Sequence, residues 1–266
     1  MTQTLDTALV DTWFDAWARS RGYQTDRRDG RRAALRSSRP VGAVRTDESA
    51  AEATAARQAQ ADLPETWEHV LVEPDDQDLS VALDRLRERP GQLLTVFGQA
   101  RADLEAAGLR EACPAELLMA VEMDPEVQDV EPPLTPEGLR AELDEPVEGS
   151  RRVRIWASGE GASTLPEGED ELAALGWVTF EGETAVYDRI WTAPQHRRRG
   201  LGSLVMRHLT SEAMTAQLSQ GLLVASPDGQ KLYGHLGWRE VAPVRIHALN
   251  GQAQGSQAEH TGTMGR

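Results

Sequence analysis

The sequence has little of what several classes of protein require. It contains one cysteine, Cys113, among 266 residues, so no disulfide can form within the chain. No apolar run approaches the ~20 residues that span a bilayer. The first residues carry acids instead of the basic flank of a secretory signal. Cys and His residues also lack zinc spacing, so we expect a cytoplasmic protein with no metal and no membrane partner.

Positive charge is scarce as well. The chain holds 28 Lys and Arg residues against 43 Asp and Glu residues, which gives a formal net charge of −15. A charge of this sign opposes a broad nucleic-acid or anionic-membrane surface. We therefore expect no nucleic-acid partner, and any anion site must be concentrated in a short segment.

Apolar periodicity in the first half predicts alternating helices and strands, an α/β pattern. A proline-rich and acidic segment, residues 124–149, predicts a linker, because such a composition seldom packs into a core. The predicted elements before it are helices over 5–17, 79–89 and 99–107 and strands over 70–73, 93–97 and 117–122.

The second half has a clearer strand pattern. Strands are predicted over 153–157, 172–180 and 184–192, and a short Gly-containing connection between the last two suits a hairpin. Residues 250–266 lack apolar periodicity, which predicts a disordered tail.

A weak internal repeat relates the two halves. Residues 93–114 align without gaps to residues 222–243 at an offset of 237 − 108 = 129, with six identities. The best-matched stretch is GLREACP against GWREVAP. We interpret the chain as two related domains, a reading in which residues 1–123 and 150–249 flank the predicted linker.

The strongest local signal is the stretch TAPQHRRRGLG at residues 192–202, which follows a predicted strand and precedes a predicted helix. Such a turn directs backbone N–H groups and the positive end of a helix dipole at one point, which suits a pyrophosphate. Gly200 and Gly202 permit close approach and unusual backbone angles. The stretch lacks the Gly-Lys-Ser/Thr ending of a P-loop and the third glycine of a dinucleotide-binding turn. A solvated turn remains the alternative.

Here the sequence resembles the GCN5-related N-acetyltransferase (GNAT) superfamily. RRRGLG fits the family's Arg/Gln-x-x-Gly-x-Gly/Ala loop, and GLLVAS followed by SPDGQKLYGHLGWRE is similar to its later strand and short helix. The resemblance covers residues 172–249 and implies an acyl-CoA N-acyltransferase fold with a mixed sheet. It also implies acetyl-CoA as co-substrate and a small-molecule or peptide amine as acceptor.

By the same resemblance, the pyrophosphate would bind Arg197, Arg198, Arg199, Gly200, Leu201, Gly202 and Ser203. The backbone of Ile190, Trp191 and Thr192 would bond the pantetheine arm and the acyl carbonyl, and the strand 222–225 would diverge to admit the cofactor.

Two residues are candidates for proton transfer. The resemblance places Tyr233 where the family often has a general acid, although a tyrosine there can serve packing alone. Asp188, the single acid of the strand 184–192, would act as base, but a surface ion pair with Arg189 explains it as well. His196 is expected to face solvent, and Trp177 and Trp191 to pack.

The offset of 129 carries the loop onto EHVLVE at residues 68–73, which has neither glycine nor arginine. We therefore interpret residues 1–123 as a degenerate GNAT-like domain without a cofactor loop, and residues 150–249 as the catalytic domain. A CoA-binding regulatory module and a structural tandem protein are the alternatives to an enzyme, and a homo-oligomer is left open.

Overall fold

The computed structural model describes residues 4–28, 31–36, 66–88, 91–124, 131–158 and 170–250. The predicted tail at 250–266 therefore lies almost wholly outside the described residues. Within them, no helix combines the length and apolarity needed to cross a membrane. The helices are α1 (Thr7–Arg21), α3 (Asp76–Glu88), α4 (Leu201–Thr215), α5 (Pro227–His235) and the 3-10 turn η2 (Pro194–His196). The strands are β1 (Gln24–Arg28), β2 (Arg31–Arg36), β3 (Thr66–Val72), β4 (Leu93–Phe97), β5 (Leu109–Glu111), β6 (Glu116–Glu122), β7 (Leu139–Asp144), β8 (Ser150–Ala157), β9 (Glu171–Glu181), β10 (Thr184–Thr192), β11 (Gln220–Ala225) and β12 (Arg239–Leu249).

The chain folds into two compact units whose boundaries differ from the predicted ones. Among the described residues, unit 1 holds those up to Pro114 and those from Pro243 onward, and unit 2 holds Ala115–Ala242. The unit boundary therefore falls inside β12. Residues 124–149, for which the sequence predicts a linker, contain strand β7. Its alternating Leu, Arg, Ala, Glu, Leu and Asp have the strand period of two, which the surrounding prolines and acids obscure.

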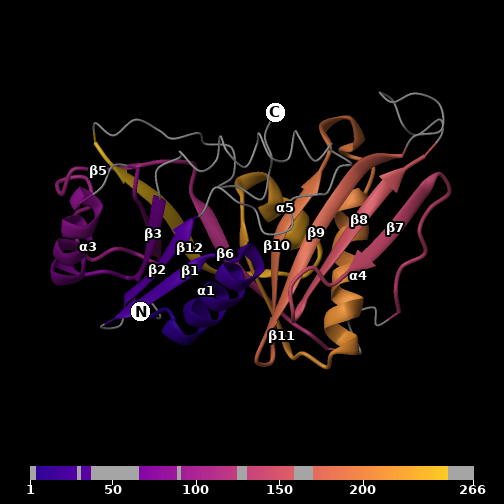
Figure 1. Cartoon of the computed structure of the whole chain (residues 1–266), viewed down its shortest axis with the longest axis horizontal. Coiled ribbons are helices and arrows are strands. Elements are labelled where there is room, and N and C mark those ends of the chain that lie inside the picture. The colour runs from indigo at the N-terminus through magenta and orange to yellow at the C-terminus, as the bar shows by residue number, and fades with distance from the viewer. Residues whose placement is uncertain are drawn as a thin grey trace, which may run out of the picture. The chain divides into compact units, whose positions relative to one another are not determined.

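Unit 1 is a sheet with a helix on each face. Its strand order is β1-β2-β3-β4-β12, with β5 also paired to β12 (Figure 1). Val96 of β4 packs in a cluster with Leu79 and Leu83 of α3. Its neighbour Phe97 points to the other face, where its ring lies 4.9 Å from that of Trp13 on α1. Successive strand residues thus face opposite helices.

Residues 99–107 do not form the predicted helix and consist of turns. The Asp103 carboxylate accepts a hydrogen bond from the Ala106 N–H at 2.9 Å, and the N–H groups of Arg101 and Ala102 both donate to the Pro74 carbonyl. These bonds compete with the helical ladder for the same backbone groups.

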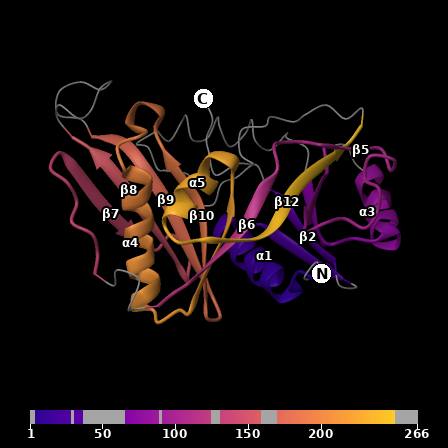
Figure 2. The same ribbon diagram turned by 180° about the vertical axis from the view of Figure 1, so that it is seen from behind.

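Unit 2 has the strand order β6-β11-β10-β9-β8-β7. Only β10 and β11 among these pair in parallel. Helices α4 and α5 lie on the same face of this sheet, the face turned to the viewer in Figure 2. Leu204 and Val205 of α4 and Tyr233 of α5 belong to one hydrophobic core together with Val153 and Ile155 of β8. Gly176 of β9 lets α4 approach, since a Cβ there would lie 2.5 Å from a Val205 methyl.

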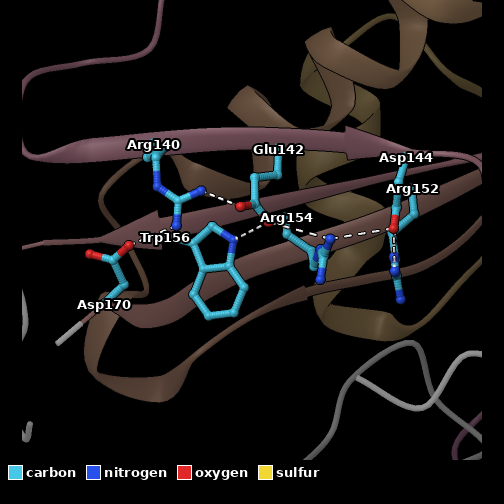
Figure 3. Close-up of polar contacts among 7 residues, drawn as sticks. All are labelled: Arg140, Glu142, Asp144, Arg152, Arg154, Trp156 and Asp170. Carbon is cyan, nitrogen blue, oxygen red and sulfur yellow. Dashed lines mark hydrogen bonds and ion pairs between the residues drawn. The ribbon is translucent and has the colours of Figure 1, made fainter. Parts of the chain in front are cut away.

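The opposite face of unit 2 carries a ladder of charges near its edge strand (Figure 3). Arg152 of β8 donates to Asp144 of β7 from both Nε and Nη2. Trp156 donates from Nε1 to Glu142 at 2.9 Å, and Arg140 pairs with Glu142 and Asp170. Charged side chains on an edge strand discourage pairing with a further chain, so the ladder protects the β7 edge.

The two halves of the sequence exchange strands. β6 follows β4 and β5 in the chain yet pairs with β11 of unit 2, through Leu222↔Ala120 and Leu223↔Met119. β12 follows β11 yet pairs with β4 of unit 1, through Leu94↔His247. The repeat maps β11 onto β4 by subtracting 129 and β6 onto β12 by adding 129, so the sum of two paired residue numbers should be equal in both pairings. The sum is 342 for β11 with β6 and 341 for β4 with β12, so the two registers agree within one residue.

Candidate functional site

The parallel strands β10 and β11 separate at their carboxyl ends. They pair from Thr184↔Gln220 to Tyr187↔Leu223, whereas β10 runs on to Thr192 and β11 continues to Ala225 paired with β6. A β-bulge accompanies the separation, because the register with β9 shifts between Asp188 and Trp191, and Arg189 has a φ of 54°. Bulges re-aim a strand and leave a residue unpaired, so Ile190, Trp191 and Thr192 border a gap in the sheet.

The opening ends at the loop that leads into α4. Gly200 is the N-cap of this helix with a φ of 79°, and no side chain caps the helix. The first N–H groups of a helix have no partner within it, so Leu201, Gly202 and Ser203 supply backbone donors at this point. A Cβ at Gly200 would meet nothing within 4 Å, which leaves the approach to these donors open.

The two loop glycines serve different purposes. Gly200 adopts the left-handed region, where side chains are strained. A Cβ at Gly202 would instead lie 3.1 Å from Leu232 of α5. Gly202 therefore allows α4 and α5 to pack closely, and Gly200 shapes the loop.

The three loop arginines are held differently. Arg197 turns back, and its Nε donates to the Thr192 carbonyl at 3.3 Å. Arg198 is exposed at a φ of 63°. Arg199 donates from Nη1 to Nδ1 of His196 at 2.9 Å. An arginine is only a donor, so His196 Nδ1 accepts and its Nε2 carries the proton.

His196 is buried at 1% exposure, which corrects the expectation that it faces solvent. Its Nε2 donates to Glu171 Oε2 at 3.1 Å, and Gln195 binds the other carboxylate oxygen. Glu171 begins β9 and was missed by sequence reasoning, because no local pattern links residues 25 positions apart. The chain Glu171–His196–Arg199 anchors the loop to the sheet.

Asp188 directly follows the last residue of β10 that pairs with β11, and Tyr233 lies on α5, the helix that follows β11. Tyr233 is buried on α5, with its ring 6.1 Å from that of Trp238. Burial, and then the charge of Asp188, raise the pKa of the Tyr233 phenol well above its usual value. The phenol therefore stays protonated at neutral pH.

The Asp188–Arg189 pair is partly buried and sits on an aromatic ring. Asp188 accepts from the Arg189 N–H at 2.8 Å, and its other oxygen lies 3.5 Å from Arg189 Nε. The guanidinium of Arg189 lies 3.6 Å from the ring centroid of buried Trp177. Trp177 therefore packs as the sequence predicts, and it fixes Arg189 beside the carboxylate.

The described ranges contain no group of three or more His, Cys, Asp or Glu side chains that could hold a metal ion. The open helix N-terminus, the space at Gly200 and the separated strands instead fit an extended ligand that carries a pyrophosphate.

Comparisons with known proteins agree with this geometry. Residues 164–240 match the family model described as "Acetyltransferase (GNAT) domain". No curated protein matches the chain's sequence. Among solved structures, a GCN5-related N-acetyltransferase from Kribbella flavida is similar over 94% of this chain and 97% of its own, at 16% identity and a TM-score of 0.58.

Two further solved structures are less similar. One is a GCN5-related N-acetyltransferase-like protein from Streptococcus suis 89/1591, which is 12% identical, with 91% of this chain and 98% of that chain covered and a TM-score of 0.48. The other is a tandem GNAT protein from the clavulanic acid biosynthesis pathway, which is 14% identical, with 93% of this chain and 97% of that chain covered and a TM-score of 0.45. The match of residues 164–240 and the Kribbella structure together establish a GNAT domain and a GNAT fold.

Proposed function

From this GNAT domain, we propose that the protein transfers an acetyl group from acetyl-CoA to a primary amine of a small molecule or peptide. One observation carries the proposal. The parallel strands β10 and β11 separate at the end where α4 begins with an uncapped N-terminus. Such an opening admits a linear thioester between the strands while its pyrophosphate meets the helix N–H groups.

The chain's own groups would act mainly by binding and orientation. The N–H groups of Leu201, Gly202 and Ser203, together with Arg198 and Arg199, would hold the pyrophosphate. The bulged backbone beyond Asp188 would orient the thioester carbonyl. Bound acetyl-CoA supplies the activated acyl group, and holding it beside the amine lowers the entropic part of the barrier.

Asp188 and Tyr233 would manage the protons. Asp188 would accept a proton from the attacking amine, directly or through water. Tyr233 would donate to the departing thiolate. Its raised pKa keeps the phenol protonated at neutral pH, so the hydroxyl carries its proton when turnover begins.

We also propose that unit 1 is a degenerate copy of unit 2. One backbone hydrogen bond of unit 1 recurs in unit 2 at the offset of 129. Leu109 N–H donates to Leu104 O in unit 1, and Trp238 N–H donates to Tyr233 O in unit 2, each at 3.0 Å. In unit 1, however, β3 and β4 stay paired up to Val72↔Phe97. No opening for a cofactor forms between these two described strands.

Acetyl-CoA titration and an amine panel test the proposal. Calorimetry should show saturable acetyl-CoA binding, and a panel of small amines and peptides should release free CoA from it. Binding without release for any amine would favour the regulatory module. An absence of binding would favour the structural tandem protein and refute the enzyme.

A further inference from the structure

Asp188, the proposed base, lies directly beside an arginine of opposite charge. One Asp188 oxygen accepts from the Arg189 N–H at 2.8 Å, and the other lies 3.5 Å from Arg189 Nε. The side chains of Asp188 and Arg189 are 18% and 20% exposed. The two charges are therefore screened less by water than a surface pair, and a ligand can still reach them.

Two features hold Arg189 in this place. Its guanidinium lies 3.6 Å from the ring centroid of Trp177, which is 2% exposed and pairs with Asp188 across β9 and β10. A cation stacked on a buried ring is held there by cation–π attraction. The backbone of Arg189 has a φ of 54° in the β-bulge, a conformation that a residue other than glycine keeps only where its surroundings require it. The cation is thus a fixed part of the site.

Two neighbouring groups do not alter the charge of this pair. Arg152 of β8 lies 5.3 Å from the centroid of the Trp177 ring, but its Nε and Nη2 both donate to Asp144 (Figure 3). Burial, and then the charge of Asp188, raise the pKa of Tyr233 on α5, so the phenol is neutral. The guanidinium stacked on the ring is therefore the cation that balances the carboxylate.

Acetyl transfer requires the acceptor nitrogen in its neutral form. The nitrogen lone pair forms the N–C bond to the acyl carbon, the C–S bond breaks, one N–H proton passes to Asp188, and the thiolate takes a proton from Tyr233. An ammonium group has no lone pair and cannot start this step. A carboxylate alone stabilises the ammonium form beside it, whereas a fixed cation near the carboxylate opposes that form.

Given the acetyl transfer proposed above, on which this role depends, we infer that Arg189 keeps the bound acceptor amine in its neutral, reactive form. Asp188 can then accept a proton during the reaction without first trapping the amine as an ammonium ion. Trp177 is a positioning residue for Arg189, since its ring holds the cation beside the carboxylate. The effect is measurable, because the pH dependence of kcat reports ionisation in the enzyme–substrate complex.

Leucinamide, or another panel amine that ionises near about pH 8, is the probe, because its α-amino group titrates in an accessible range. In wild type, kcat for CoA release from acetyl-CoA should rise with pH as the bound amine loses its proton. Arg189→Met should move the midpoint of this rise upward by about one pH unit, the lower end of the effect of an adjacent charge. At neutral pH its KM for the amine should fall together with kcat, because the bound ammonium form cannot react. Damage to the site would raise KM instead.

Two further variants separate charge from packing. Arg189→Lys keeps a cation and should restore the wild-type midpoint. Arg152→Met is the matched control, since Arg152 lies on the same Trp177 ring but pairs with Asp144, and its midpoint should stay at the wild-type value. An unchanged midpoint in Arg189→Met, or an equal shift in Arg189→Lys or Arg152→Met, would overturn the role of Arg189 and leave acetyl transfer standing. No CoA release from any amine of the panel would refute acetyl transfer, and the role of Arg189 with it.

Discussion

At the scale of single residues, the loop before α4 depends on Gly200, which combines a left-handed backbone with open space in front of it. Gly200→Asp should abolish acetyl-CoA binding, because a carboxylate there occupies and repels the pyrophosphate. The strain should cost about 1 kcal/mol of unfolding free energy. Calorimetry and thermal melts measure both effects.

Gly182 offers a matched control for that substitution. It has a φ of 56° with nothing within 4 Å of a Cβ, in the turn between β9 and β10. Gly182→Asp should show a similar loss of stability with unchanged acetyl-CoA affinity. Equal affinities in both folded variants would place the site elsewhere.

The position of Arg199 depends on His196, and two amide substitutions separate the two bonds of this histidine. His196→Asn keeps an acceptor near Nδ1 for Arg199, whereas His196→Gln keeps a donor near Nε2 for Glu171. If the orientation of Arg199 matters, the Gln variant should bind CoA about tenfold more weakly, the loss of one hydrogen bond to a charged group. The Asn variant should stay near wild type.

A substrate without the pyrophosphate separates orientation from general damage. The KM for S-acetylpantetheine should be the same in wild type and both His196 variants. If the Asn and Gln variants weaken CoA binding equally, His196 contributes to the packing of the loop and not to the orientation of Arg199.

Tyr233→Phe keeps the buried ring and removes only the hydroxyl. Stability and acetyl-CoA affinity should change little, while kcat should fall by roughly 10²-fold, the lower end of general-acid effects, because water can substitute. Steady-state rates with the best amine measure this. Wild-type turnover in Tyr233→Phe would mean that Tyr233 serves only packing. Equal losses of affinity and turnover would mean that it binds the cofactor.

At the scale of elements, the two parallel strand pairs differ in the way that matters for a cofactor. β10 and β11 separate after Tyr187 and Leu223, whereas β3 and β4 pair to their ends, and the Glu73 N–H donates to Phe97 O at 2.9 Å. The chain should therefore bind one acetyl-CoA. Calorimetric stoichiometry near one in wild type, and near zero in Gly200→Asp, would agree; a value of two would refute the degenerate copy.

Local patterns predicted part of this arrangement. The bounds of β10, Thr184–Thr192, and the turn into α4 agree with the sequence prediction, because alternation, glycines and helical spacing are short-range signals. The α/β fold with a mixed sheet is confirmed. The bulge after Asp188 and the role of Glu171 were not predictable, since both depend on pairing across strands and no periodicity encodes it. The assignments of the site residues remain predictions.

At the scale of the whole molecule, the exchange of β6 and β12 makes each half incomplete alone. A fragment of residues 150–266, the predicted catalytic domain, lacks β6 and exposes the edge of β11. It should fail to fold, as judged by the absence of a cooperative melt in circular dichroism. Coexpressed fragments 1–124 and 125–266 should form a complex that binds acetyl-CoA. Cooperative unfolding and acetyl-CoA binding by 150–266 alone would contradict this account.

The same exchange sets an order on how the protein can be made. Leu94 leaves the ribosome long before its strand partner His247, 247 − 94 = 153 residues later. At about 5–20 residues per second, the sheet of unit 1 waits roughly 8–30 s for its last strand. Unit 1 begins the chain and is completed only by the end of the chain. A premature stop just before Pro243 would therefore remove the last strand of the unit whose synthesis started first.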